Sequence, residues 1–177
     1  AKGSGMAIGS FVAAPNVNDV VPEYLETGRF EPRASVATIA NAMDCGNPSN
    51  FDRMLWLYGG NLDAMRADVS GSRHDDHEVR AAIRYVYDRH GYLLDPHSAI
   101  AYQGLKARAG WDGQPQIGVF LATAHPAKFA AIVDPIVGRE MEKPGPLAEA
   151  LARPRHPIRS DASRAAVRGR GVRGGAG

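Results

Sequence analysis

The 177-residue sequence predicts an α/β fold of few strands and several helices, followed by a disordered basic tail. Two apolar runs bounded by turn-forming residues, at 8–14 and 115–122, are typical of buried strands. Several other segments repeat apolar residues at helical spacing and begin or end at capping residues, glycine or proline. From Ser160 onward the chain is arginine, glycine, alanine and serine with almost no large apolar residue, so it cannot bury enough surface to fold.

The first expected strand, residues 8–14, leads into a polar loop that contains Asn16, Asn18 and Asp19. Short polar side chains of this kind bond readily to nearby backbone, which favours a turn or a helix cap. Loops at the carboxyl ends of strands are also where ligands bind in open α/β sheets. The sequence leaves these two interpretations open, and a short helix over Val20–Gly28 is expected next.

A second polar loop, residues 41–50, follows an expected strand or extended segment at 36–39. The loop has little to bury, so its length calls for an explanation. Ser49 or Asn50 can cap the next expected helix, residues 51–58, which Gly59 and Gly60 end. Another short helix is expected over residues 62–69.

Two longer helices are expected in the middle of the chain. One begins at Asp75–Asp76, where acidic residues suit the helix dipole, and ends before Gly91. The other begins at Pro96, a residue well tolerated in a first helical turn. The run Asp95–Ser98 is expected to cap that helix, because neighbouring residues cannot form a Ser/His/Asp relay.

The junction after the second apolar run is the most informative segment. Residues 115–122 are expected to form a strand covered on both faces, and Pro126 to open a helix that runs to residue 137. Thr123 and His125 lie between them, where free backbone N–H groups attract anions and polar ligands. The two side chains either cap the helix or face a ligand. After Gly138 repeated prolines predict that order fades.

Composition and charge exclude several classes of function. The formal net charge is +2, but residues 151–177 carry seven arginines against one aspartate, which leaves the first 150 residues at −4. The single cysteine excludes an internal disulfide and multi-cysteine metal sites, and it favours a cytoplasmic location. No apolar run approaches the roughly 20 residues that a membrane span needs. The run His74–His77 lies at a helix start without ligand spacing, so no metal site is predicted.

Four segments, in order and with matching spacing, resemble the threonine synthase family. They are residues 11–19, 36–44 together with 47–51, 91–99 and 122–129, the last reading Ala-Thr-Ala-His-Pro-Ala-Lys-Phe. The resemblance covers residues 1–153 and corresponds to the last third of the family's chain. It implies the C-terminal portion of a fold-type-II pyridoxal-phosphate enzyme. Residues 154–177 depart from the family's ending, as a frameshift would produce, and are expected to form the disordered tail.

The resemblance implies a reaction and a cofactor. Threonine synthases convert O-phospho-L-homoserine and water to L-threonine and phosphate with pyridoxal 5'-phosphate, which stabilises carbanions beside the amino group. By position, Thr123 matches the hydroxyl residue that pairs with the pyridine nitrogen of the cofactor. Seven further polar residues fall in the family's polar segments and are expected to contact substrate or to support residues that do: Asn16, Asn18, Asp19, Asn41, Asp44, Asn50 and His97.

The resemblance also implies what this chain lacks. The lysine that holds the cofactor as a Schiff base and the loop that binds its phosphate belong to upstream segments. Lys128 matches a family position but is not that lysine. No catalytic residue is therefore assigned within this chain, which is expected to be inactive unless the N-terminal portion is supplied.

Two alternatives remain at the level of the sequence. The chain could be a fragment of another fold-type-II lyase, although the segment around Thr123 argues against this. It could also be a non-catalytic binding module whose arginine tail contacts nucleic-acid phosphates. A charged disordered run is more often inert, so nucleic acid is not the expected partner.

Overall fold

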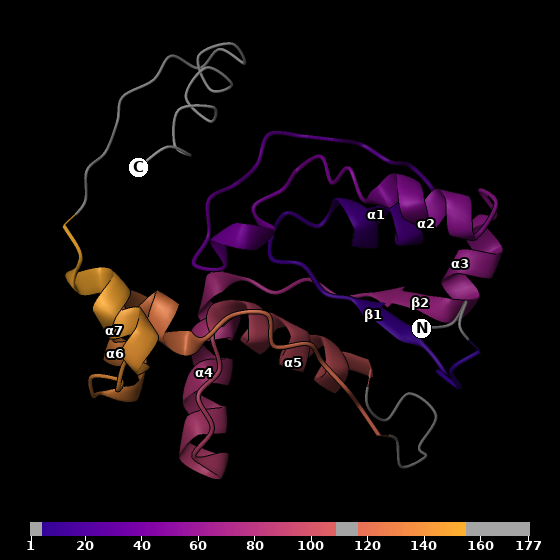
Figure 1. The fold of residues 1–177 in the computed structure, drawn as a ribbon. Helices are drawn as coiled ribbons and strands as arrows, with labels where there is room; N and C mark the ends of the chain where they lie inside the picture. The colour runs from indigo at the N-terminus through magenta and orange to yellow at the C-terminus, as the bar shows by residue number, and fades with distance from the viewer. Residues whose placement is uncertain (1–4, 109–116, 155–177) are drawn as a thin grey trace, which may run out of the picture. The chain divides into compact units, whose positions relative to one another are not determined.

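The structure is a computed structural model that describes residues 5–108 and 117–154 (Figure 1). The chain divides into two compact units, Ala1–Glu142 and Lys143–Gly177, and each is described by itself. The predicted disordered tail lies, apart from Pro154, outside the described residues. None of the described helices is long and apolar enough to cross a membrane.

The sheet of the first unit has two parallel strands among the described residues. Strand β1 (Phe11–Ala13) confirms the first expected strand in shortened form, and it pairs with β2 (Val69–Gly71), with Phe11 opposite Val69. Strand β2 was not predicted, because residues 62–69 were expected to be helical. Helix α3 (Leu62–Asp68) does form there, and β2 follows it directly.

A first apolar cluster packs three helices on one another and on β2. Helix α1 (Val20–Thr27) contributes Tyr24 and Leu25, α2 (Phe51–Leu57) contributes Phe51, and α3 contributes Met65. The Tyr24 ring meets the Phe51 ring edge-on at 4.7 Å. Helix α1 ends as predicted at Gly28, whose φ of 77° is readily adopted only by glycine.

The second and larger cluster joins α4 (Asp76–His90), α5 (Pro96–Arg108) and α6 (Ala130–Val137). Both long helices match the sequence prediction, and α4 begins with a reciprocal capping box between Asp75 and Glu78. Helix α5 also packs on β1 and the residue after it: a Cβ at Gly104 would lie 3.3 Å from a side-chain carbon of Val12 and 2.6 Å from the Cβ of Ala14. The members of this cluster that are at most 5% exposed are Ala40, Val79, Ala82, Ile83, Val86, Leu94, Ala99, Ile100 and Val133.

The second expected strand is wrong over its described part. Residues 117–122 form no strand, and Ile117, Val119 and Leu121 are 98%, 76% and 78% exposed. Alternate residues do face the protein: a Cβ at Gly118 would lie 3.1 Å from Leu105, and the Phe120 ring is 6.4 Å from the Tyr102 ring. The segment runs along α5 with one face covered, because no neighbouring strand pairs with it among the described residues (Figure 1).

The remaining elements depart from prediction in smaller ways. The helix expected from Pro126 begins as the 3-10 turn η3 (Pro126–Phe129) and continues as α6. Residues 36–39 form no strand. Helix α7 (Gly145–Ala152) occupies the stretch where order was expected to fade, because Pro144 and Pro146 lie at its start, where proline is tolerated.

Candidate functional site

Asn16 and Asn18 lie buried just after β1, at 1% and 6% exposure. The Oδ1 atom of Asn16 accepts the backbone N–H of Asn18 at 2.9 Å and its Nδ2 at 2.8 Å, which closes a tight turn. The turn interpretation is therefore confirmed for this loop. Both side chains also reach a second segment more than fifteen residues away in sequence, so they do more than shape the turn.

Asn18 holds the extended segment at Val36 as a neighbouring strand would. Its Oδ1 accepts the Val36 N–H at 2.8 Å, and its Nδ2 donates to the Val36 carbonyl at 2.9 Å. The side-chain amide thus replaces the peptide group that a paired strand would offer. These two hydrogen bonds hold Val36 in place although residues 36–39 form no strand.

Asn16 holds the polar loop through Thr38 and Asp44. Its Nδ2 lies 2.8 Å from both Thr38 Oγ1 and Asp44 Oδ1. Asp44 also accepts the Thr38 N–H at 3.0 Å and the Thr38 hydroxyl at 2.8 Å. The hydrogen-bonding groups of both asparagine amides are occupied, so these side chains fix the loop and are not available to a ligand.

His97 fixes the same loop from the opposite side. It begins α5 beside Asp95, which is fully buried and accepts the His97 backbone N–H and Nδ1, each at 2.9 Å. The Ser98 hydroxyl donates to the other oxygen of Asp95. The predicted capping role is thus confirmed. In addition, His97 Nε2 accepts the backbone N–H of Ala42 at 3.1 Å.

The other predicted polar residues separate into two groups. Asp19 lies at the start of α1, where it pairs with Arg33 and lies 3.6 Å from Arg73. Glu23 and then Asp19 beside the Arg33 guanidinium raise its pKa above the ordinary value. Asn41 and Asn50 are instead exposed, and neither side chain is hydrogen-bonded to a described residue. Asn50 precedes α2 without making the side-chain cap that the sequence suggested.

Thr123 lies on the exposed stretch before η3, and no hydrogen bond joins it to another described residue. Its neighbour His125 does cap the turn: Nδ1 accepts the Ala127 N–H at 3.1 Å. The capping interpretation is confirmed for His125, whereas the Thr123 hydroxyl has no partner among the described residues. Phe129, at the end of η3, has its ring 5.0 Å from the His97 ring. The 3-10 turn η3, which follows Thr123, thus contacts through Phe129 the histidine that holds the polar loop.

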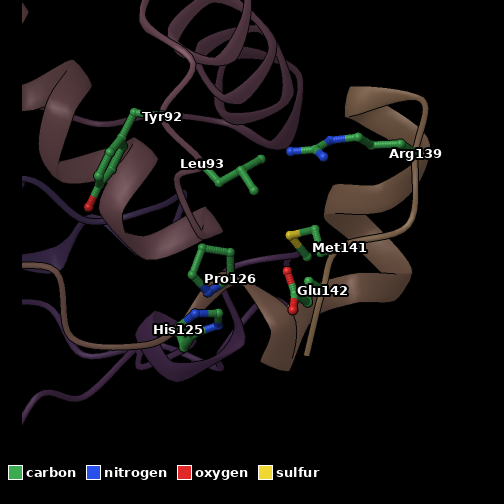
Figure 2. Close-up of a pocket in the computed structure, with 7 residues that line it drawn as sticks. All are labelled: Tyr92, Leu93, His125, Pro126, Arg139, Met141 and Glu142. Atoms are coloured by element: carbon green, nitrogen blue, oxygen red, sulfur yellow. The ribbon is translucent and has the colours of Figure 1, made fainter. Parts of the chain in front are cut away.

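A shallow cavity of about 380 Å³ opens beside His125 (Figure 2). Its walls come from the segments before α5, at the start of η3 and after α6. Arg139 extends its guanidinium across the cavity toward Leu93. The seven lining residues are Tyr92, Leu93, His125, Pro126, Arg139, Met141 and Glu142.

Sequence reasoning missed several residues that build the site. Thr38 was predicted only as part of a strand. Asp76 accepts the Ile39 N–H at 3.2 Å, and no local sequence pattern predicts that contact. Asp95 was expected only as a cap, and its second role, orienting the His97 ring through Nδ1, was not predicted. Among the described residues, no group of three or more His, Cys, Asp or Glu side chains is arranged to hold a metal ion.

Comparison with known proteins identifies close relatives. Residues 98–169 match the family model described as "Threonine synthase, C-terminal". The threonine synthase of Haemophilus influenzae is 40% identical over 144 residues, which cover 81% of this chain and 33% of that protein. The crystal structure of threonine synthase from Escherichia coli superposes with a TM-score of 0.78 and 36% identity, covering 86% of this chain and 35% of that one.

A third relative is a threonine synthase whose structure is described as PLP-bound. The crystal structure of PLP-bound threonine synthase from Brucella melitensis matches with a TM-score of 0.77 and 33% identity. The match covers 86% of this chain and 38% of that structure. The chain therefore spans about a third of the length of the relatives it matches.

Proposed function

Because this chain belongs to the threonine synthase family and matches the C-terminal part of its members, we propose that it forms the C-terminal part of a threonine synthase. The complete enzyme would convert O-phospho-L-homoserine and water to L-threonine and phosphate in the cytoplasm. The observation that carries the proposal is the agreement of sequence and fold with threonine synthases over most of the chain. The same agreement favours this reaction over that of another fold-type-II lyase.

One described residue, Thr123, offers a group suited to pyridoxal 5'-phosphate. The cofactor, when bound, withdraws electrons from the carbon beside the amino group of the substrate. The exposed Thr123 hydroxyl has no partner among the described residues and can bond to the pyridine nitrogen. An uncharged hydroxyl leaves that nitrogen less protonated than a carboxylate would, which moderates the electron withdrawal.

The lysine that the cofactor needs is assigned to a partner portion. Lys106 lies over the Tyr85 ring at 5.0 Å, and Lys128 is exposed on η3 beyond the His125 cap. Neither stands in a water-excluded pocket of the kind that activates a lysine amine. We propose that the lysine-bearing N-terminal portion, together with its phosphate-binding loop, completes the site and that this chain is inactive without it.

Completion of the site can be tested with a chimera. In it, residues 1–153 of this chain replace the C-terminal third of the Haemophilus influenzae threonine synthase. We expect the chimera to bind the cofactor and to release phosphate from O-phospho-L-homoserine, and the isolated chain to do neither. Phosphate release by the isolated chain would refute its inactivity, whereas a folded, cofactor-loaded chimera without activity would refute the proposed reaction.

The role of Thr123 can be tested in the same chimera. Replacing Thr123 with valine removes the hydroxyl and keeps the branched shape, so kcat should fall about tenfold or more. The absorbance maximum of the bound cofactor should also shift, because the pyridine nitrogen loses its partner. Thr123→Ser is the matched control and should keep both properties. Equal activity and spectra in the valine and serine variants would contradict the assignment.

A further inference from the structure

The 3-10 turn η2 (Asn41–Met43), called the Asn41 turn below, is exposed, yet buried groups hold its backbone on both sides. Before it, Ala40 is fully buried, its N–H donates to Thr38 Oγ1 at 3.1 Å, and its carbonyl accepts Asn16 Nδ2 at 3.4 Å. Within it, the Ala42 N–H is bound by His97. The backbone of this surface turn is therefore fixed by side chains from three separate segments of the chain.

The contact at Ala42 fixes the protonation of His97. A backbone N–H can only donate, so His97 Nε2 must be the acceptor and carry no proton. The ring proton then sits on Nδ1, which faces Asp95 Oδ1 at 2.9 Å. Asp95 thereby sets the orientation and the tautomer that the Asn41 turn requires. The resulting link joins residues 55 positions apart in sequence.

Helix capping alone does not account for the imidazole. Asp95 already accepts the His97 backbone N–H and the Ser98 hydroxyl at the start of α5, and an apolar side chain at position 97 would leave both bonds intact. What the imidazole adds is an acceptor at Ala42, obtained by burying a polar ring at 5% exposure. Burying a polar ring carries a desolvation cost. A need to hold the turn in one place would explain why an imidazole is nevertheless buried here.

The side chain that this placement presents is Asn41. Its carboxamide is exposed and makes no hydrogen bond to a described residue, although the side chains of Asn16, Thr38 and His97 bond to the backbone on either side of it. A free carboxamide on a fixed backbone offers both a donor and an acceptor at a set position. Polar ligand contacts in enzyme sites are built in this manner, with supporting residues that lock the contacting one.

We propose that Asn41 contacts the substrate amino acid through its carboxamide and that His97, oriented by Asp95, is a positioning residue that holds Asn41 for this contact. The assignment rests on the proposed function and extends it to a specific residue pair. His97 does not itself reach the ligand: its two ring nitrogens are taken by Asp95 and Ala42. Its effect on the reaction passes through the turn.

The positioning step is tested on the full chain without any ligand, by amide hydrogen exchange. Replacing His97 with leucine should speed exchange at the Ala42 amide about tenfold, because the hydrogen bond to it is lost. His97→Gln restores an acceptor near the Nε2 position and should stay within about threefold of wild type. The Val79 amide, bonded to the Asp75 carbonyl in α4, reports whether the fold is intact. Unchanged exchange at Ala42 in the leucine variant overturns the positioning role.

The contact step is tested in the chimera by separating KM from kcat. Asn41→Ala should raise KM for O-phospho-L-homoserine about tenfold with little change in kcat, and His97→Leu should do the same. His97→Gln should rescue KM, and Asn47→Ala, which alters an exposed asparagine of the same loop, should not move it. An unchanged KM in Asn41→Ala overturns the contact. An inactive wild-type chimera counts against the proposed function instead, and the exchange measurement remains independent of it.

Discussion

The loop network around Asn16 and the segment 117–123 differ in the hydrogen bonding of their backbone groups. In the network, buried or half-buried side chains bond the N–H or C=O groups of Val36, Thr38, Ala40 and Ala42. In residues 117–123, no backbone hydrogen bond to another described residue is made, and alternate apolar side chains are exposed. The first region is complete within this chain, whereas the second has the pattern of a strand that awaits a neighbour.

This contrast separates what the chain can do alone from what it needs. The side chains that hold the Asn41 turn all belong to the first unit. Thr123 directly follows residues 117–122, one face of which is exposed at Ile117, Val119 and Leu121.

The largest effect is expected inside the network. Asn16→Leu removes both hydrogen bonds to Asn18 and those to Thr38 and Asp44, and leaves buried groups without partners. The free energy of unfolding should fall by about 3 kcal/mol, as measured by urea denaturation of the chain. Asn47→Ala, at an exposed position of the polar loop, should change it by less than about 0.5 kcal/mol. Similar losses in the two variants would show that the network is not a special source of stability.

A smaller and conditional effect is expected at Val119, on the uncovered segment. Val119→Asp should change the unfolding free energy of the isolated chain by less than about 0.5 kcal/mol, since the side chain is 76% exposed. In the chimera the same change should cost about 2 kcal/mol, because a carboxylate would be buried against a neighbouring strand. Arg80→Ala, on the exposed face of α4, should be neutral in both proteins. A neutral Val119→Asp in the chimera would mean that the segment stays uncovered there.

Elements with local sequence signals were predicted correctly, whereas elements that depend on distant contacts were not. Helix α4 was predicted correctly because its signals are local: Asp75 and Glu78 form the capping box, and Gly91 closes the helix with a φ of 64°. Strand β2 was missed because three residues after a helix carry no periodic signal. The apolar pattern of residues 117–122 predicted a strand covered on both faces. In the structure the side chains of Ile117, Val119 and Leu121 are exposed, and no described residue covers that face.

The candidate site was readable by residue type but not by role. Asn16, Asn18, Asp44 and His97 were all singled out, yet the sequence could not separate loop-holding side chains from ligand-facing ones. That distinction depends on pairs such as Ala42 and His97, which are 55 positions apart. Local patterns do not encode such contacts. The cofactor role of Thr123 stays a prediction.

The smallest effect concerns the buried histidine beside the network, His74. Its Nε2 lies 3.1 Å from the Ser72 hydroxyl, its Nδ1 has no hydrogen-bond partner among the described residues, and the nearest carboxylate, Glu78, is 3.5 Å away. Desolvation lowers the pKa of His74 below its ordinary value of 6.5, and Glu78 only partly opposes this. The folded chain therefore holds this imidazole neutral where the unfolded chain would protonate it.

The sign of the resulting pH dependence follows from proton uptake. As pH falls from about 7.5 through the ordinary histidine pKa, the unfolded state gains a proton at His74 that the folded state does not, so stability should decrease. The loss should level off below the folded-state pKa. In His74→Gln the unfolding free energy should depend less on pH between 7.5 and 5.5, whereas Ser72→Ala keeps the imidazole and should retain the wild-type slope. Urea midpoints at several pH values measure this, and parallel curves for wild type and His74→Gln would rule out His74 as the source.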